Sequence, residues 1–211
     1  MAQGASDEGS FLFDEATSSY YSQRAGEYDD WWLGTGLFAQ RERPGWAEEV
    51  AELIEIVEGL PPLSILDVGC GTGFLTAHLP GEVTALDSST DMLAIAAKRL
   101  RRDGRVICGE ALPLPFVDDT FDFVFTSHFY GHLPPHERDA FLAEARRVGS
   151  DLLVVDSAMR DGVQAEGWEE RVLNDGSHHR VYKRFFHAGE LADELGAKVL
   201  HAGRWFVVVA T

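Results

Sequence analysis

Cysteine and basic residues are scarce in this chain of 211 residues, and each scarcity excludes a class of protein. The two cysteines, Cys70 and Cys108, form neither a disulfide framework nor a pair with zinc-site spacing. We therefore expect a reduced, cytoplasmic protein without a metal site. Only 18 Lys and Arg residues stand against 35 Asp and Glu residues, a formal net charge of −17. Because nucleic acids and anionic membranes attract clustered cations, neither is an expected partner.

Long apolar runs are also missing, since none approaches the roughly 20 residues that span a bilayer. The first ten residues, MAQGASDEGS, lack the basic and apolar regions of a secretory signal, and we expect a disordered start at 1–10. Hydrophobic residues nevertheless make up 45% of the chain, which is enough for a folded core. These properties favour one globular unit that binds a small molecule, neutral or cationic, as a monomer or a homodimer.

From residue 44 onward, strand-like and helix-like patterns alternate. Trp46, Val50 and Leu53 recur at helical spacing and predict a first helix that ends near Gly59. Strands are then expected at 64–68, 83–86, 105–108, 121–126 and 152–155, and helices at 73–78, 90–102, 135–148 and 187–195. Two last strands are expected at 198–201 and 205–210. This order predicts a Rossmann-like, doubly wound α/β fold with a mostly parallel seven-stranded sheet and an antiparallel C-terminal edge strand.

Two stretches stand apart from this alternation. Residues 11–43 are rich in aromatic side chains, and we expect short N-terminal helices there that form a lid over the main domain, residues 44–211. Residues 157–184 are polar and loop-like. We expect this second stretch to cover a bound substrate.

The segment LDVGCGTGF at 66–74 places a glycine-rich loop directly after a strand. Glycine can adopt φ > 0 and lets a ligand approach the main chain, so this context predicts a cofactor site. Dinucleotides usually require the spacing G-x-G-x-x-G, but Phe74 occupies the position of the third glycine. Asp67 would also place a carboxylate near a pyrophosphate. Both residues argue against NAD and favour a cationic ligand.

The loop and three later segments resemble the motifs of class I S-adenosylmethionine (SAM)-dependent methyltransferases. These segments are ILDVGCGTGFLT at 65–76, VTALD at 83–87, GEALPLPF at 109–116 and HLP at 132–134. The likeness extends from about Tyr20 to Leu195 and is greatest to small-molecule enzymes of the ubiquinone and menaquinone biosynthesis type. It implies that SAM is the cofactor, bound by Tyr20, Arg24, Asp67, Gly69, Cys70, Gly71, Gly73, Asp87, Ser88, Met92, Glu110, Ala111, Leu112 and Ser127.

The resemblance also implies individual roles. Asp87, at a strand end, would accept the two ribose hydroxyls in a charge-assisted contact. Glu110 and the backbone N–H of Ala111 would meet the adenine ring, with Met92 packed on its face. Arg24 would pair with the carboxylate of the methionine part, near a tyrosine ring that faces the sulfonium. Alternatively, Met92 is a core residue and the tyrosines only hold the first helix on the domain.

The strand at 121–126 continues into SHFYGHLPP, and ligands of parallel sheets bind beyond the carboxyl ends of the strands. His128 is the first candidate for a general base and His132 the second, although His132 could be structural. A neutral histidine can take a proton from a phenol, another hydroxyl or an amine, and an enolic carbon is an equally permitted nucleophile. We expect substrate contacts from Tyr130, Trp168, His178 and Tyr182.

The expected function is therefore the transfer of a methyl group from SAM to an oxygen, nitrogen or carbon atom of a small molecule. Two alternatives stay open. One is an NAD(P)-dependent oxidoreductase on a similar sheet, and the other is a SAM-binding protein that transfers no methyl group.

Overall fold

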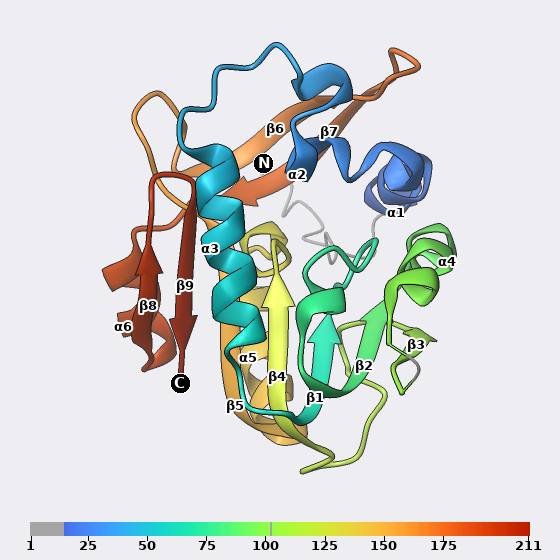
Figure 1. The fold of residues 1–211 in the computed structure, drawn as a ribbon, viewed down its shortest axis with the longest axis vertical. Coiled ribbons are helices and arrows are strands. Elements are labelled where there is room, and N and C mark those ends of the chain that lie inside the picture. The colour runs from blue at the N-terminus through green and yellow to red at the C-terminus, as the bar shows by residue number, and fades with distance from the viewer. Residues whose placement is uncertain (1–14, 102) are drawn as a thin grey trace, which may run out of the picture.

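A computed structural model describes residues 15–101 and 103–211 of the chain. The expected disordered start at 1–10 and the first residues of the expected lid, 11–14, lie outside the described residues. Figure 1 shows a central sheet with helices on both faces and a hairpin beyond one end of its strands.

The central sheet has seven strands in the order β3-β2-β1-β4-β5-β9-β8. The strands β1 to β5 run parallel, β9 runs antiparallel to both of its neighbours, and β8 forms the edge. This arrangement confirms the predicted fold class. The strands are β1 (Leu63–Val68), β2 (Gly81–Asp87), β3 (Arg105–Cys108), β4 (Phe121–Ser127), β5 (Gly149–Ser157), β8 (Lys198–Ala202) and β9 (Phe206–Ala210).

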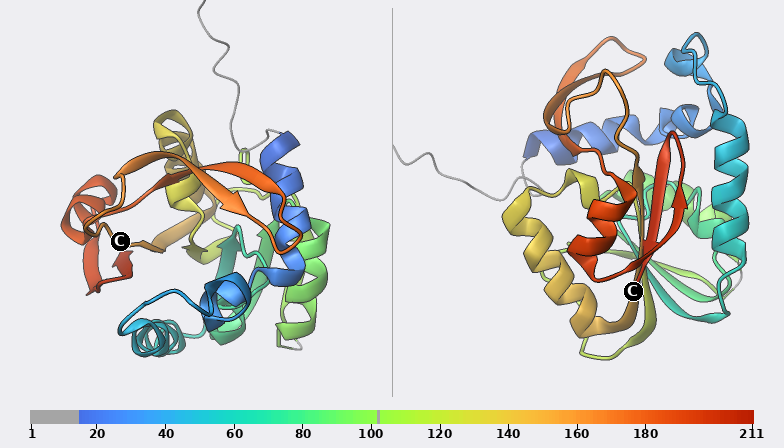
Figure 2. Two further views of the ribbon diagram at one scale, coloured as in Figure 1. Left: turned by 90° about the horizontal axis from the view of Figure 1, so that it is seen from above. Right: turned by 90° about the vertical axis from the view of Figure 1, so that its left-hand side faces the viewer.

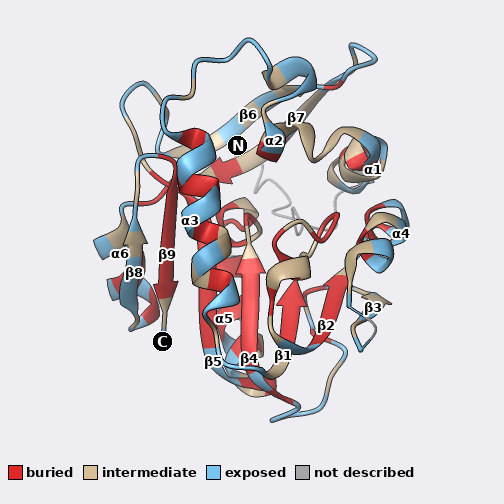
Figure 3. Cartoon of the chain, viewed as in Figure 1, coloured by how far each residue is buried: buried red, intermediate tan, exposed pale blue. Residues whose placement is uncertain are grey.

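Alternate residues of the central strands enter two separate cores, and Figure 3 shows these strands as the most buried part of the molecule. Leu66 and Val124 contribute to the core under α5 (Pro135–Val148) and α6 (Ala188–Leu195). Ile65 and Phe125 point the other way, into the core under α3 (Trp46–Glu58). Such two-sided burial explains why these strands read as continuous apolar runs in the sequence.

The predicted helices are present with shorter ends. The helix α4 covers Thr90–Arg99, and Ser89 caps its N-terminus by accepting the N–H of Met92 at 3.3 Å. The helix expected at 73–78 is reduced to a short 3₁₀ turn, η3 (Thr76–His78). Gly73 has a φ of 75°, which is incompatible with a right-handed helix starting at that residue.

Short helices also form in the N-terminal segment, as predicted. They are α1 (Glu15–Arg24), η1 (Ala25–Glu27), α2 (Asp30–Leu33) and η2 (Gly36–Phe38), and a further single 3₁₀ turn, η4 (Tyr130–His132), follows β4. Polar contacts tie the N-terminal segment to the rest of the chain. Asp29 accepts the hydroxyl of Thr72 at 2.6 Å and pairs with Arg99, and the Glu27 carboxylate accepts the backbone N–H of Asn174.

The expectation of a loop over 157–184 is wrong, because this stretch holds the antiparallel hairpin β6 (Glu166–Val172) and β7 (His178–Arg184). The hairpin extends from the α6 side of the molecule toward α1, as the left view in Figure 2 shows. It buries few apolar side chains, chiefly Leu173 and Val181 against Tyr20, so its sequence carries no apolar stripe. The Asp175-Gly176 pair at its turn is the signal that could have predicted it.

Candidate active site

A pocket opens at the carboxyl ends of β1, β2, β3 and β4, between α1 and the hairpin. Its empty space is about 910 Å³, including the part open to solvent. The lining residues are Thr17, Ser18, Tyr21, Tyr28, Gly69, Gly71, Leu86, Asp87, Ser88, Met92, Gly109, Glu110, Ala111, His128, Phe129, His132, Trp168, Val181 and Tyr182.

The glycine loop forms the floor of this pocket. Gly69 has a φ of 71°, and a Cβ atom at this position would lie 2.6 Å from the ring of Phe129. Gly71 has a φ of 54° and turns its backbone N–H toward the carboxylate of Asp87, at 2.8 Å. The loop therefore lacks side chains for two reasons. It packs under an aromatic ring, and glycine leaves its main chain accessible to a ligand.

Asp87 ends β2 and lines the pocket at its centre. One carboxylate oxygen accepts the N–H of Gly71 and the other accepts the N–H of Ser89 at 2.9 Å. Each oxygen keeps a second lone pair for a ligand hydroxyl. Burial raises the pKa of Asp87 above its ordinary value, while these N–H groups oppose the rise.

A smaller side pocket adjoins this floor and shares Tyr28 and Gly69 with the main pocket. Asp67 lies there, 1% exposed, and accepts the hydroxyl of Thr76 at 2.6 Å through Oδ2. Burial raises the pKa of Asp67 to about 7. Its Oδ1 and the Oγ of Ser127 are both buried without a hydrogen-bond partner among the described residues. Two such unsatisfied polar atoms fit a ligand that brings hydrogen-bond donors, and a carboxylate fits a cationic one.

The other residues expected at the glycine loop fall into two groups. Cys70 lines the side pocket, whereas Gly73 lies against the backbone of Ala96 in α4, 3.2 Å from an added Cβ. Phe74 stacks on Trp32 with the ring centroids 4.7 Å apart. Gly73 therefore permits close packing of the loop on a helix.

The N-terminal segment presents different tyrosines to the pocket from the one expected. Tyr20 is buried against the hairpin, and Tyr21 and Tyr28 line the pocket instead. Arg24 donates to the hydroxyl of Tyr20 at 2.6 Å, and its guanidinium lies 4.8 Å from the centroid of the Tyr28 ring. No carboxylate pairs with this guanidinium among the described residues, and Arg24 is not among the residues that line either pocket.

The residues that follow β2 and β3 complete one end of the pocket. Ser88, Met92, Glu110 and Ala111 line it, whereas the partly buried Leu112 packs against the core. The pKa of Glu110 is raised, first by burial and then by the charge of Asp87. This end therefore offers carboxylate acceptors beside apolar surface.

The two histidines after β4 occupy different surroundings. His128 has a φ of 55° and lies 8% exposed beside the rings of Trp31 and Trp32. Burial lowers its pKa to about 3. His132 lies partly exposed beside the ring of Tyr21, and burial lowers its pKa well below the ordinary value. Both imidazoles are therefore neutral near pH 7.

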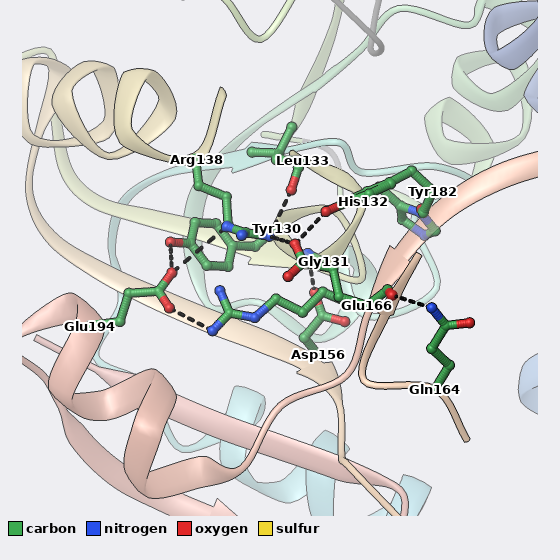
Figure 4. Close-up of polar contacts among 11 residues, drawn as sticks. Tyr130, Gly131, His132, Leu133, Arg138, Asp156, Gln164, Glu166, Tyr182 and Glu194 are labelled. Carbon is green, nitrogen blue, oxygen red and sulfur yellow. Dashed lines mark hydrogen bonds and ion pairs between the residues drawn. The ribbon is translucent and has the colours of Figure 1, made fainter. Parts of the chain in front are cut away.

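The residues expected to touch a substrate separate in the structure. Trp168 and Tyr182 line the pocket from the hairpin, whereas the exposed His178 begins β7 and does not line it. Tyr130 is fully buried beneath the pocket, and its hydroxyl donates to Glu194 at 2.6 Å (Figure 4).

Several lining residues were missed by sequence reasoning. Tyr21 and Tyr28 belong to the aromatic segment at 11–43, which was predicted to form helices. The spacing of residues along a helix does not show which of these rings face the pocket and which are buried. Thr17, Ser18 and Val181 carry no motif signal at all. Among the described residues, no group of His, Cys, Asp and Glu could hold a metal ion, and no helix is long and apolar enough to cross a membrane.

Part of the chain is similar to known methyltransferases. The family model for a methyltransferase domain matches residues 65–150. A demethylmenaquinone methyltransferase of Thermotoga maritima is 41% identical over 108 residues, which cover 49% of this chain and 44% of the relative. Residues 65–150, which hold the glycine loop and both histidines after β4, are therefore similar to a methyltransferase domain.

A second curated relative matches part of the chain, and two solved structures share its fold over 93% and 96% of it. A demethylmenaquinone methyltransferase of Bacillus velezensis is 34% identical over 113 residues, covering 49% of this chain and 46% of the relative. The chain thus aligns with less than half the length of these two curated methyltransferases. The solved structure of DhpI with SAH is 25% identical with a TM-score of 0.70, over 93% of this chain and 94% of DhpI. The DhpI structure with SAM and HEP has a TM-score of 0.74 at 24% identity, over 96% and 98% of the two chains.

Proposed function

We propose that this protein binds SAM across the glycine loop and transfers its methyl group to a small-molecule acceptor. The side pocket gives the main support for this proposal. There the buried Oδ1 of Asp67 and Oγ of Ser127 have no hydrogen-bond partner among the described residues. The α-ammonium group of SAM is such a donor and carries the charge that a buried carboxylate favours. When bound, SAM supplies a methyl group on a sulfonium, which is already activated toward a nucleophile.

The remaining contacts follow from the floor of the pocket. Asp87 keeps one lone pair on each oxygen for the ribose hydroxyls, and Glu110 and Ala111 lie where an adenine ring would end. Arg24 would hold the carboxylate of the methionine part, and the Tyr28 ring that its guanidinium covers lines both pockets. The expected cofactor residues that line the two pockets extend from Asp67 in the side pocket to Glu110 in the main pocket. Tyr20, Arg24, Gly73 and Leu112 are not among the lining residues.

The acceptor would enter on the opposite side, between α1 and the hairpin. Tyr21, His132, Trp168, Val181 and Tyr182 line this part of the pocket, which we name the acceptor half. Its surface is aromatic and apolar with a few polar atoms, as small-molecule sites usually are. The main task of these residues would be to align the nucleophile and to exclude water. We place the reaction in the cytoplasm, in keeping with the two free cysteines.

Calorimetry with SAM, S-adenosylhomocysteine and NAD+ tests this proposal. We expect binding of the two sulfur compounds and none of NAD+, because the Asp67 carboxylate would repel a pyrophosphate at the loop. Binding of NAD+ alone would favour the oxidoreductase alternative. Binding of both sulfur compounds without methyl transfer to any acceptor would favour a protein that only senses or carries SAM.

A further inference from the structure

Tyr28, in the N-terminal segment, borders both pockets. Its ring lines the main pocket and the side pocket. The ring also lies against the glycine loop, because a Cβ atom added to Gly71 would be 3.6 Å from it. Tyr28 itself lies between two short helical pieces, η1 and α2, so its position depends on the contacts of its neighbours in the chain.

The residues on either side of Tyr28 are held by different elements. The Glu27 carboxylate accepts the backbone N–H of Asn174 at 2.9 Å, in an exposed contact at the turn of the hairpin. The Asp29 carboxylate accepts the hydroxyl of Thr72 at 2.6 Å, in a partly buried contact at the glycine loop. Water screens a partly buried contact less than an exposed one, so the contact of Asp29 is the stronger attachment.

Arg99, the last residue of α4, completes the contact at the loop. Its Nη1 atom donates to the carbonyl oxygen of Thr72 at 3.1 Å and lies 3.2 Å from the Thr72 hydroxyl, and its Nη2 atom pairs with Asp29. Thr72 is 1% exposed and lies between Gly71 and Gly73, which both have positive φ. A planar guanidinium can bridge two such partners at once. We name Asp29, Thr72 and Arg99 the clamp.

The helix α4 supports both the glycine loop and the N-terminal segment. Gly73 of the loop packs on Ala96, where an added Cβ would approach to 3.2 Å. The helix α1 lies beside α4 (Figure 1), and the hydroxyl oxygens of Ser22 and Ser89 are 3.2 Å apart. Met92 of the same helix lines the main pocket. The clamp therefore joins the loop and the N-terminal segment at a helix that also borders the pocket.

The clamp is too exposed to contribute much to the stability of the fold. The side chain of Arg99 is 32% exposed and that of Asp29 is 19% exposed. Ion pairs that remain in contact with water contribute little to the free energy of unfolding. Its effect should instead appear in the position of the neighbouring Tyr28 ring, and so in ligand binding.

We propose that Arg99 is a positioning residue for the cofactor, an inference that rests on the proposed function. Through Thr72 and Asp29 it holds the Tyr28 ring on the glycine loop in the arrangement that binds SAM. Arg99 lines neither pocket, so it acts through the residues that it holds. With the clamp intact, the ligand meets a preformed site, and less binding free energy is lost in ordering that site.

Calorimetry with S-adenosylhomocysteine as the probe tests the role of Arg99. Arg99→Met removes the donors and keeps the apolar stem, and we expect the Kd to rise by about 10-fold. Arg99→Lys keeps the positive charge and should bind more tightly than Arg99→Met. The matched control is Arg105→Met, because Arg105 donates to the hydroxyl of Thr84 at 2.8 Å at the start of β3, away from the pocket. An unchanged Kd in Arg99→Met, an equal loss in Arg105→Met, or equal Kd values for the Lys and Met variants would overturn the proposal.

The same measurement in a Tyr28→Ala protein distinguishes positioning from a general structural role. If Arg99 acts through Tyr28, adding Arg99→Met to Tyr28→Ala should change the Kd by at most about twofold, the usual error of such a cycle. If Arg99 only supports the fold, the loss should be as large as it is with the tyrosine present, and the proposal is wrong.

A second variant covers the case in which Arg99→Met does not fold, which circular dichroism detects. Asp29→Asn removes the charge that Arg99 pairs with, and it should raise the Kd in the wild type but not in the Tyr28→Ala protein. Equal effects of Asp29→Asn in both proteins contradict the inference. Failure of the proposed function is separate, because the wild-type protein would then not bind S-adenosylhomocysteine at all.

Discussion

Asp67→Asn tests the electrostatics of the side pocket directly. The carboxyl group has an ordinary pKa of 3.8, and burial raises it to about 7 in the folded protein. A folded-state pKa above the unfolded one means that the folded chain holds the proton more tightly. The stability from this group is therefore complete below about pH 4 and is lost as the pH rises through about 7. A difference of about three pH units corresponds to about 4 kcal/mol of unfolding free energy.

Urea denaturation of both proteins near pH 5 and near pH 8 measures this effect. The wild type should lose about 2–3 kcal/mol between the two conditions from this group, and the variant should lose none of it. The substitution introduces a buried amide without a full set of partners, which costs about 1–3 kcal/mol at any pH. The titration of Asp67 is therefore measured by the change in unfolding free energy between pH 5 and pH 8, and not by the stability at one pH. Exposed Asp139, changed to Asn, is the control. Equal pH dependence in the wild type and Asp67→Asn would refute a buried, perturbed carboxyl.

Three further changes probe the pocket and its support. Asp87→Ala should weaken SAM binding by about 10- to 100-fold in calorimetry, because hydrogen bonds to a charged group contribute about 1.5–3 kcal/mol. An unchanged affinity would show that Asp87 is not part of the site. Gly69→Ala should lower the unfolding free energy by at least about 1 kcal/mol in urea denaturation, because φ is positive there and an added Cβ would collide with the ring of Phe129. An unchanged unfolding free energy would contradict this packing. Tyr130→Phe should cost about 1 kcal/mol in stability with SAM affinity unchanged, because its hydroxyl serves Glu194, and a loss of affinity would place Tyr130 in the site.

The sequence predicted the sheet well because its central strands are buried on both faces. Mainly apolar runs such as 65–68 and 123–126, when they alternate with helices, are typical of a parallel sheet covered on both sides. The place of the glycine loop at the strand ends was predicted for a related reason. Gly69, Gly71 and Asp87 lie next to the ends of strands. Their position in the fold therefore follows from the order of the strands along the chain.

The hairpin and the lid were harder to predict, because their residues depend on contacts between distant segments. Tyr20 and Tyr21 are adjacent in the sequence, yet one packs under the hairpin and the other faces the pocket. The β6–β7 strands alternate between two partly exposed faces, so polarity suggested a loop. Tyr130 follows β4 directly, as the histidines do, but its turn directs it toward Glu194.

Contacts between distant segments also distinguish His128 from His132, and the sequence does not show these contacts. Their order in SHFYGHLP favoured His128, which lies closer to the strand end. What separates them is the partner of each Nδ1 atom, a serine hydroxyl for His128 and a hairpin carbonyl for His132. A hydroxyl can donate or accept and leaves the tautomer open, whereas a carbonyl determines it. The hairpin thus sets the chemistry of a residue 50 positions earlier in the chain, through a main-chain oxygen that no side-chain motif records.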